Sequence, residues 1–210
     1  MAQFSKTCSN IKLDGSVLSA SCRTSSGGTK PSSVDLDKHI GNTDGYFDIS
    51  GTNYTTGAKD ASLISRTVLS DELITSDGKS TRKARINLDN YVGNNSGSLT
   101  WVMTSKGDFA SSSSHLSLKG TILSATCKKS DGSSTQSSLD LSDHLGNMHG
   151  SLDFISKGFQ DASESIELDG TVLKVQLRGD GDEVFCNMLD LNLHVGNDEG
   201  KLTWKTLIRV

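Results

Sequence analysis

The stretch Asp35-Leu36-Asp37-Lys38-His39-Ile40-Gly41-Asn42-Thr43-Asp44-Gly45 recurs three more times along the chain, at 87–97, 140–150 and 190–200. Each copy ends in a Gly-Asn-x-x-Gly turn. The closing glycines, Gly45, Gly97, Gly150 and Gly200, stand 50 to 53 residues apart. Self-similarity at a near-constant period marks a tandem repeat. The sequence therefore predicts one small unit copied four times.

Each copy opens with apolar and polar residues that alternate around a turn dipeptide. Residues 11–22 alternate around Asp14-Gly15, and residues 116–127 and 166–177 do the same around Lys119-Gly120 and Asp169-Gly170. The second copy, at 63–69, is more diverged. This pattern predicts a β-hairpin with one buried face. Polar, glycine-rich loops follow at 23–28, 75–79, 129–133 and 178–182, and a further strand leads into the turn. The repeat is therefore expected to be all-β.

Bulk composition narrows the domain organisation and the function class. The chain has 210 residues, which suits two domains of about 100 residues each, and Met103–Asp108 is the candidate linker. Net charge is −4, with no basic stripe, so we expect no nucleic-acid partner. No window is apolar enough for membrane insertion. The N-terminus shows no signal peptide, which favours a cytoplasmic or non-classically secreted protein.

Several recurring residues are expected to serve the scaffold. Asp35, Asn87, Asp140 and Asp190 each precede a predicted helical turn, and we interpret them as caps. Trp101 and Trp204 occupy equivalent strand positions and are predicted to pack in the core, as are His39, Tyr91, His144 and His194. For the turn asparagines, a structural role and a ligand role both stay open. Asp44 and Glu199 are expected not to serve the turn geometry, which favours a functional role for them.

The pattern resembles the cyanovirin-N family of small lectins. The match is carried by residues 4–8, by residues 14–18 with Cys22, and by 23–28, 32–36, 42–45, 86–89 and 97–99. The resemblance implies an all-β chain of two tandem cyanovirin-N-like domains, 1–105 and 106–210. Each would be a pseudo-symmetric pair of three-stranded sheet plus β-hairpin units. It also implies metal-independent binding of mannose-containing oligosaccharides or glycoproteins that end in α1→2-linked mannose, with no catalysis, no cofactor and no metal.

The family resemblance also implies a disulfide between Cys8 and Cys22. The equivalent pairs in the other three copies are Ala58 with Leu73, Ser113 with Cys127, and Ser163 with Leu177. No Cys-x-x-Cys motif occurs that would suggest zinc or redox chemistry. Cys127 and Cys186 are therefore predicted to be free.

By the same resemblance, each domain is expected to carry two carbohydrate sites. The first chain-end site would use Lys6, Thr7, Arg23, Ser25, Asn94, Asn95 and Ser96. The first middle site would use Asn42, Asp44, Thr52, Asn53, Thr56, Thr75 and Ser76. The second chain-end site would use Ser111, Ser112, Lys128, Ser130, Asn197, Asp198 and Glu199. The second middle site would use Asn147, His149, Asp161, Arg178 and Asp180.

The sequence favours two of these sites and leaves other functions open. The first middle site and the second chain-end site rank highest because Asp44 and Glu199 supply an acid beside the turn. One alternative is a glycoside hydrolase with a carboxylate pair, although no organised pocket motif supports it. Another is a structural or protein-interaction module with decayed sugar sites. The assembly is expected to be a monomer or a domain-swapped dimer.

Overall fold

The computed structural model describes residues 2–102 and 107–205, and it consists of short β-strands and single turns of 3₁₀ helix. The predicted domain boundary, between residues 105 and 106, lies outside the described residues, as does most of the candidate linker. No helix in the described part of the chain is long and apolar enough to cross a membrane. The prediction of an all-β chain is confirmed.

The first domain is built from ten strands. In the first copy these are β1 (Cys8–Asp14), β2 (Val17–Arg23), β3 (Thr29–Asp35), β4 (Gly41–Thr43) and β5 (Tyr46–Asp48). In the second copy they are β6 (Ser62–Ile64), β7 (Val68–Ile74), β8 (Thr81–Asn87), β9 (Val92–Asn95) and β10 (Ser98–Trp101). The 3₁₀ turns are η1 (Phe4–Lys6), η2 (Leu36–Lys38), η3 (Tyr54–Gly57) and η4 (Leu88–Asn90).

The second domain repeats this order. The third copy holds β11 (Ser113–Lys119), β12 (Ile122–Lys128), β13 (Ser134–Asp140), β14 (Gly146–Met148) and β15 (Ser151–Asp153). The fourth holds β16 (Ser163–Asp169), β17 (Val172–Arg178), β18 (Val184–Asp190), β19 (Val195–Asp198) and β20 (Lys201–Trp204). Its 3₁₀ turns are η5 (Phe109–Ser112), η6 (Leu141–Asp143), η7 (Phe159–Ala162) and η8 (Leu191–Leu193).

The chain crosses over between the two halves of each domain. The hairpin β9–β10 packs against β3 of the first copy, and β19–β20 packs against β13 in the same way. The hairpins β4–β5 and β14–β15 pack against β8 and β18 of the following copies. Each half is therefore one three-stranded sheet plus a hairpin from the neighbouring copy, as predicted.

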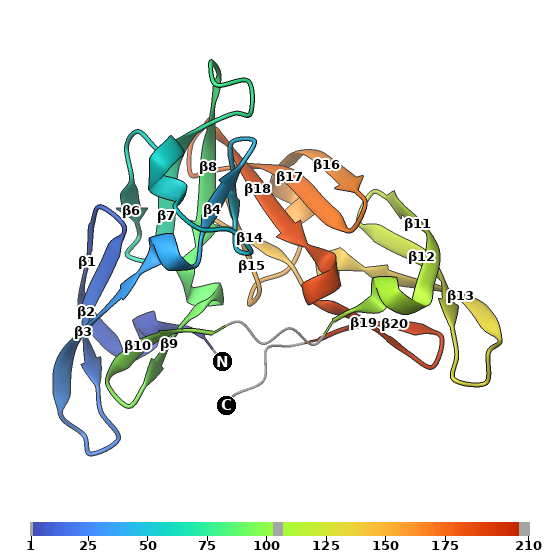
Figure 1. Ribbon diagram of the computed structural model, residues 1–210, viewed down its shortest axis with the longest axis horizontal. Helices are drawn as coiled ribbons and strands as arrows, with labels where there is room; N and C mark the ends of the chain where they lie inside the picture. The colour runs from blue at the N-terminus through green and yellow to red at the C-terminus, as the bar shows by residue number, and fades with distance from the viewer. Residues whose placement is uncertain (1, 103–106, 206–210) are drawn as a thin grey trace.

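The two domains share a sheet. Strand β18 pairs in parallel with β8, and the six strands run in the order β16-β17-β18-β8-β7-β6. Figure 1 shows the three-stranded sheets β1–β3 and β11–β13 at opposite ends of the molecule, with this six-stranded sheet between them. The contact is two-sided, because β5 also packs against β18 and β15 against β8.

Capping residues begin the helical turns where they were predicted. The side chains of Asp35, Asn87, Asp140 and Asp190 each accept a hydrogen bond from the backbone N–H two residues later. Such a cap satisfies a donor that a helix terminus otherwise leaves unpaired. The scaffold role assigned to these four residues is confirmed.

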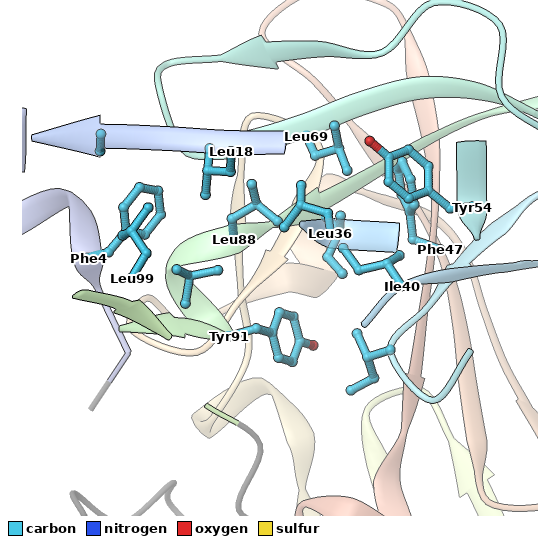
Figure 2. Close-up of a cluster of buried hydrophobic side chains, with 14 of the residues drawn as sticks. Phe4, Leu18, Leu36, Ile40, Phe47, Tyr54, Leu69, Leu88, Tyr91 and Leu99 are labelled. Atoms are coloured by element: carbon cyan, nitrogen blue, oxygen red, sulfur yellow. The ribbon is translucent and has the colours of Figure 1, made fainter. Parts of the chain in front are cut away.

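Each domain has its own apolar core. In the first domain, Phe4, Leu18, Leu36, Tyr54 and Leu88 are fully buried (Figure 2). Burying one such side chain contributes about 1.5–3 kcal/mol. In the second domain, Phe109, Leu123, Leu141, Phe159 and Leu191 are the corresponding buried residues. Phe154 packs against both cores.

A row of aromatic rings runs between the cores. Trp101 stacks between His39 and Tyr91, with ring centroids 5.0 and 5.5 Å away. Trp204 stacks between His144 and His194 at 5.2 and 5.5 Å. Phe154 joins the two stacks through edge contacts with Tyr91 and His194. The packing role predicted for these tryptophans and their neighbours is confirmed.

The cysteines follow the prediction that the resemblance made. Cys8 and Cys22 form a disulfide, and Cys127 and Cys186 are free and buried. At the equivalent position of the third copy, Ser113 donates a hydrogen bond to the Cys127 sulfur at 3.3 Å. Ala58 pairs with Leu73 and Ser163 with Leu177, as the alignment of the copies required.

Candidate functional site

The asparagine of each Gly-Asn-x-x-Gly turn joins that turn to a loop of the neighbouring copy. Its Oδ1 accepts from the N–H of the closing glycine at 2.7–2.9 Å. Its Nδ2 donates to the carbonyl at the end of a facing strand. These pairs are Asn42 with Ile74, Asn94 with Arg23, Asn147 with Arg178, and Asn197 with Lys128. In all four copies the asparagine therefore has a structural role, since it holds its own turn and ties that turn to the facing strand.

The residue before each closing glycine does serve the turn geometry. Its φ is +52° at Asp44, +48° at Ser96, +52° at His149 and +49° at Glu199, and the following glycine is also positive. A two-residue hairpin turn needs positive φ at both central residues. The prediction that Asp44 and Glu199 stand apart from turn geometry is therefore wrong. Their side chains nevertheless point to the facing loop.

The first middle site is a hollow of about 310 Å³. It is lined by Asp44, Thr75, Ser76, Asp77, Ser80, Thr81 and Arg82. Ser76 donates to one Asp44 oxygen from its backbone N–H at 3.0 Å and from its hydroxyl at 2.9 Å. These hydrogen bonds, the backbone one above all, hold the pKa of Asp44 below its ordinary value.

Two charged residues of this hollow were missed by the sequence. Arg82 on β8 reaches the second Asp44 oxygen, at 3.3 Å. Asp77 accepts from the N–H groups of Lys79 and Ser80 and from the Thr75 hydroxyl, and these bonds hold its pKa well below its ordinary range. Arg82 is the second residue of β8, the strand that follows the loop, so only the register of β8 could have placed it there.

The second chain-end site has the same arrangement with a longer acid. Ser130 donates to Glu199 from its N–H at 3.2 Å and from its hydroxyl at 2.9 Å. Asn197 also donates to the hydroxyl and carbonyl of Ser112. Asp198 lies on the other face of the hairpin, where it accepts from Lys205 and Thr203. The structure therefore brings Glu199, Ser130 and Ser112 together, but not Asp198.

The first chain-end site carries no acid in the turn. Ser96 exchanges a hydrogen bond with the Ser25 hydroxyl at 2.9 Å and accepts from the Ser25 N–H at 3.1 Å. Asn94 donates to Thr7 as well as to the Arg23 carbonyl. Lys6 and Asn95 are exposed close by in sequence. Neutral groups alone therefore join the turn and the loop here: the hydroxyls of Thr7, Ser25 and Ser96, the Asn94 amide and the Arg23 backbone carbonyl.

The second middle site contains a histidine–aspartate contact in place of an acid–serine contact. His149 Nδ1 lies 2.6 Å from an Asp180 oxygen, across the gap between turn and loop. The Arg178 side chain pairs instead with Glu164 at 2.5 Å. Asp161 is exposed in η7, and no hydrogen bond within the described residues joins it to the turn.

Four predicted residues of the first middle site do not line its hollow: Asn42, Thr52, Asn53 and Thr56. Thr52 and Asn53 are exposed and hydrogen-bonded to each other at 3.3 Å, and Thr56 is exposed in η3. Gly57, at the end of η3, lies so close to the Asn42 amide that an added Cβ would stand 2.5 Å away. The 3₁₀ turn η3 therefore lies against both Asn42 and Ile74.

The chemistry available at the four sites is that of fixed donors and acceptors. Carboxylates, hydroxyls and backbone groups are held in place by mutual hydrogen bonds. Within residues 2–102 and 107–205, no group of three or more His, Cys, Asp or Glu is placed to hold a metal ion. Such an arrangement suits the recognition of a neutral polyhydroxylated ligand.

Comparison with known proteins gives a family match over nearly the whole chain. A sequence profile of the CVNH domain matches residues 4–100 and again 109–203. Among solved structures, the CVNH protein of Gibberella zeae is 34% identical, with 48% of this chain and 98% of that chain covered and a TM-score of 0.42. The CVNH protein of T. borchii is 32% identical, with 47% and 99% covered and a TM-score of 0.43. Microvirin, solved in complex with mannobiose, is 31% identical, with 48% and 99% covered and a TM-score of 0.44.

Proposed function

The chain belongs to the CVNH domain family, as two tandem copies, and from this premise we propose that it is a lectin for mannose-rich glycans ending in α1→2-linked mannose. Binding is metal-independent and involves no catalysis. The partners are mannose-containing oligosaccharides or the glycoproteins that carry them.

One observation carries the proposal: the hollow of the first middle site. Its volume, about 310 Å³, lies at the lower end of the range of small-ligand pockets. Its lining combines an ionised acceptor, Asp44, with a cationic donor, Arg82, and a hydroxyl donor, Ser76. Adjacent sugar hydroxyls need an acceptor and a donor side by side, because each hydroxyl both donates and accepts.

The groups of this hollow are ordered before any ligand arrives. Asp44 is fixed by three hydrogen bonds, and the loop that carries Ser76 is fixed by Asp77. Preorganisation lowers the entropy that binding must otherwise offset. Repetition of the arrangement along one chain supports avidity for branched glycans, because a second contact on the same glycan is intramolecular.

Calorimetric titration of the full chain with α1→2 mannobiose tests the proposal. We expect measurable heat with the wild-type chain, a reduced number of sites or a reduced affinity in Asp44→Ala, and a separate reduction in Glu199→Ala. Asp48→Asn is the matched control, because Asp48 lies on the same hairpin but accepts from Thr43 and Ser50.

Two outcomes would contradict the proposal. The absence of binding by any saccharide on a glycan array and in millimolar titrations would favour a structural or protein-interaction module with decayed sites. If Asp44→Ala bound as the wild type does, the first middle site would not be the main site.

A further inference from the structure

The second middle site is built against a strand of the other domain. Its turn lies at the tip of the hairpin β14–β15, and β15 packs on β8 of the first domain. Met148 and His149 are half-buried there, whereas Asp198 and Glu199 at the equivalent positions are exposed. The hairpin therefore reaches its site position by docking on the first domain.

Three buried polar residues hold this docked hairpin. Asn90 donates to the Leu152 carbonyl at 2.9 Å and accepts from the Phe154 N–H at 3.2 Å. Asn87 donates to Asp153 at 3.2 Å, and both of these residues are fully buried. Buried polar groups left unpaired are costly, so these contacts fix where the hairpin lies on the first domain.

Arg85 of β8 connects the turn to its facing loop. Its Nη1 donates to the His149 carbonyl, and its Nε donates to Ser70 Oγ at 3.2 Å. Its guanidinium carbon lies 3.4 Å from the centre of the Phe185 ring. A Cβ added to Gly179, at the start of the loop, would stand 2.9 Å from the same Nη1. Arg85 thus touches both sides of the gap that the pair His149–Asp180 spans.

The turns of the other three sites differ in the hydrogen bonds that they receive, although the first middle site also borders the other domain, because β5 packs on β18. The residues packed beneath their closing glycines are Lys30 with Thr24 at Gly97, Arg82 at Gly45, and Thr135 with Lys129 at Gly200. Each of these belongs to the same domain as the glycine that it faces, as do Phe185 and Gly179 beneath Gly150, so the hydrogen bond to the turn is what sets the second middle site apart. Among the described residues, the second middle site is the one whose turn receives a hydrogen bond from a charged side chain of the other domain.

We propose that the second middle site is a carbohydrate site made by both domains, in which Arg85 is the positioning residue that sets the gap between the His149 turn and the Asp180 loop. The inference rests on the proposed function and names a determinant that lies outside the domain carrying the site. Its ligand is the same neutral saccharide class. Loss of the Arg85 contacts releases the turn and the loop from each other without touching the other three sites.

The test follows backbone amide shifts of the ¹⁵N-labelled full chain during titration with α1→2 mannobiose. Arg85→Met removes the donors but keeps apolar volume, and methionine is the residue at the equivalent position of the fourth copy, Met188. Arg85→Lys keeps the charge. Lys83→Met is the matched control, because Lys83 lies on the same strand and pairs across the domains with Glu183 on the exposed surface.

In the wild type we expect sugar-dependent shifts at Met148–Gly150 and Gly179–Asp180. In Arg85→Met these responses should need at least about tenfold more sugar, as expected for loss of a hydrogen bond from a charged donor. Arg85→Lys should lie between the two, and Lys83→Met should match the wild type. The shifts at Asp44, Gly45, Glu199 and Gly200 should remain those of the wild type in every variant.

The inference is overturned if the wild-type turn at His149 shows no response, or if Arg85→Met responds as the wild type does. If Arg85→Met fails to give a dispersed spectrum, the comparison of Arg85→Lys with the wild type decides, and equal affinity overturns the inference. A lack of response at all four turns would instead defeat the proposed lectin function, so the two failures are distinguishable.

Discussion

Replacing His194 with phenylalanine should remove a large part of the loss of stability that mild acid causes. His194 is 3% exposed, and its Nε2 has no hydrogen-bond partner within the described residues. Burial lowers its pKa from the ordinary 6.5 to about 4. The folded state therefore resists a proton that the unfolded state takes up readily.

The sign and size of the effect follow from linkage. Well above pH 6.5 neither state binds the proton, so His194 does not lower the free energy of unfolding there. As the pH falls from 6.5 toward 4, the unfolded state alone becomes protonated and stability declines. With these two pKa values, the loss at pH 5 is about 2 kcal/mol relative to neutral pH. Most carboxylates with lowered pKa values act only below this window, because their unfolded pKa is 3.8.

Urea unfolding at pH 7.5 and pH 5.0, at fixed ionic strength, measures this loss. We expect His194→Phe to be as stable as the wild type at pH 7.5. Between pH 7.5 and pH 5, its free energy of unfolding should fall by about 2 kcal/mol less than that of the wild type. Circular dichroism should accompany tryptophan fluorescence, because Trp204 stacks on residue 194. His115→Asn, at an exposed position with φ +53° that asparagine tolerates, is the control. Parallel pH dependences of wild type and His194→Phe would refute the reasoning.

Three further predictions concern stability. Asp153→Ala should cost on the order of 3 kcal/mol in urea unfolding, because it leaves the buried Asn87 amide and the Ser156 hydroxyl and N–H without their acceptor; a loss below 1 kcal/mol would contradict this. Reduction of Cys8–Cys22 should lower stability by about 3 kcal/mol, the value for a loop of this length, and the Cys8→Ala and Cys22→Ala double variant should reproduce that loss without reductant. Gly41→Ala should lower the melting temperature, because the new Cβ would stand 2.8 Å from the Gly51 Cα; an unchanged melting temperature would show that the loop yields freely.

Local features of the fold were predictable because they depend on residues close in sequence. The caps at Asp35 and Asp190 and the hairpin around Asp14-Gly15 follow from turn and cap chemistry. The positive φ at Asp44 was misjudged because residue type was weighed without the strand register that forces a two-residue turn.

Features that join distant segments were not predictable in this way. Nothing in the composition of β8 distinguishes Arg82, which reaches the first middle site, from Arg85, which reaches the second domain. The pairing of β18 with β8 depends on two strand edges that no local pattern marks. The site residues that those strands contribute were therefore missed, whereas most turn and loop residues were found, Asp77 being the exception.

The parallel seam between β8 and β18 gives this single polypeptide the geometry of an isologous dimer. The strand order mirrors across the seam, and β5 on β18 corresponds to β15 on β8. A true homodimer must place the same side chain on both sides of its axis. A single chain is free of that constraint, and the equivalent positions hold different residues, Arg85 on one side and Met188 on the other. In one chain, two equivalent surfaces can therefore carry different side chains while their stoichiometry stays fixed.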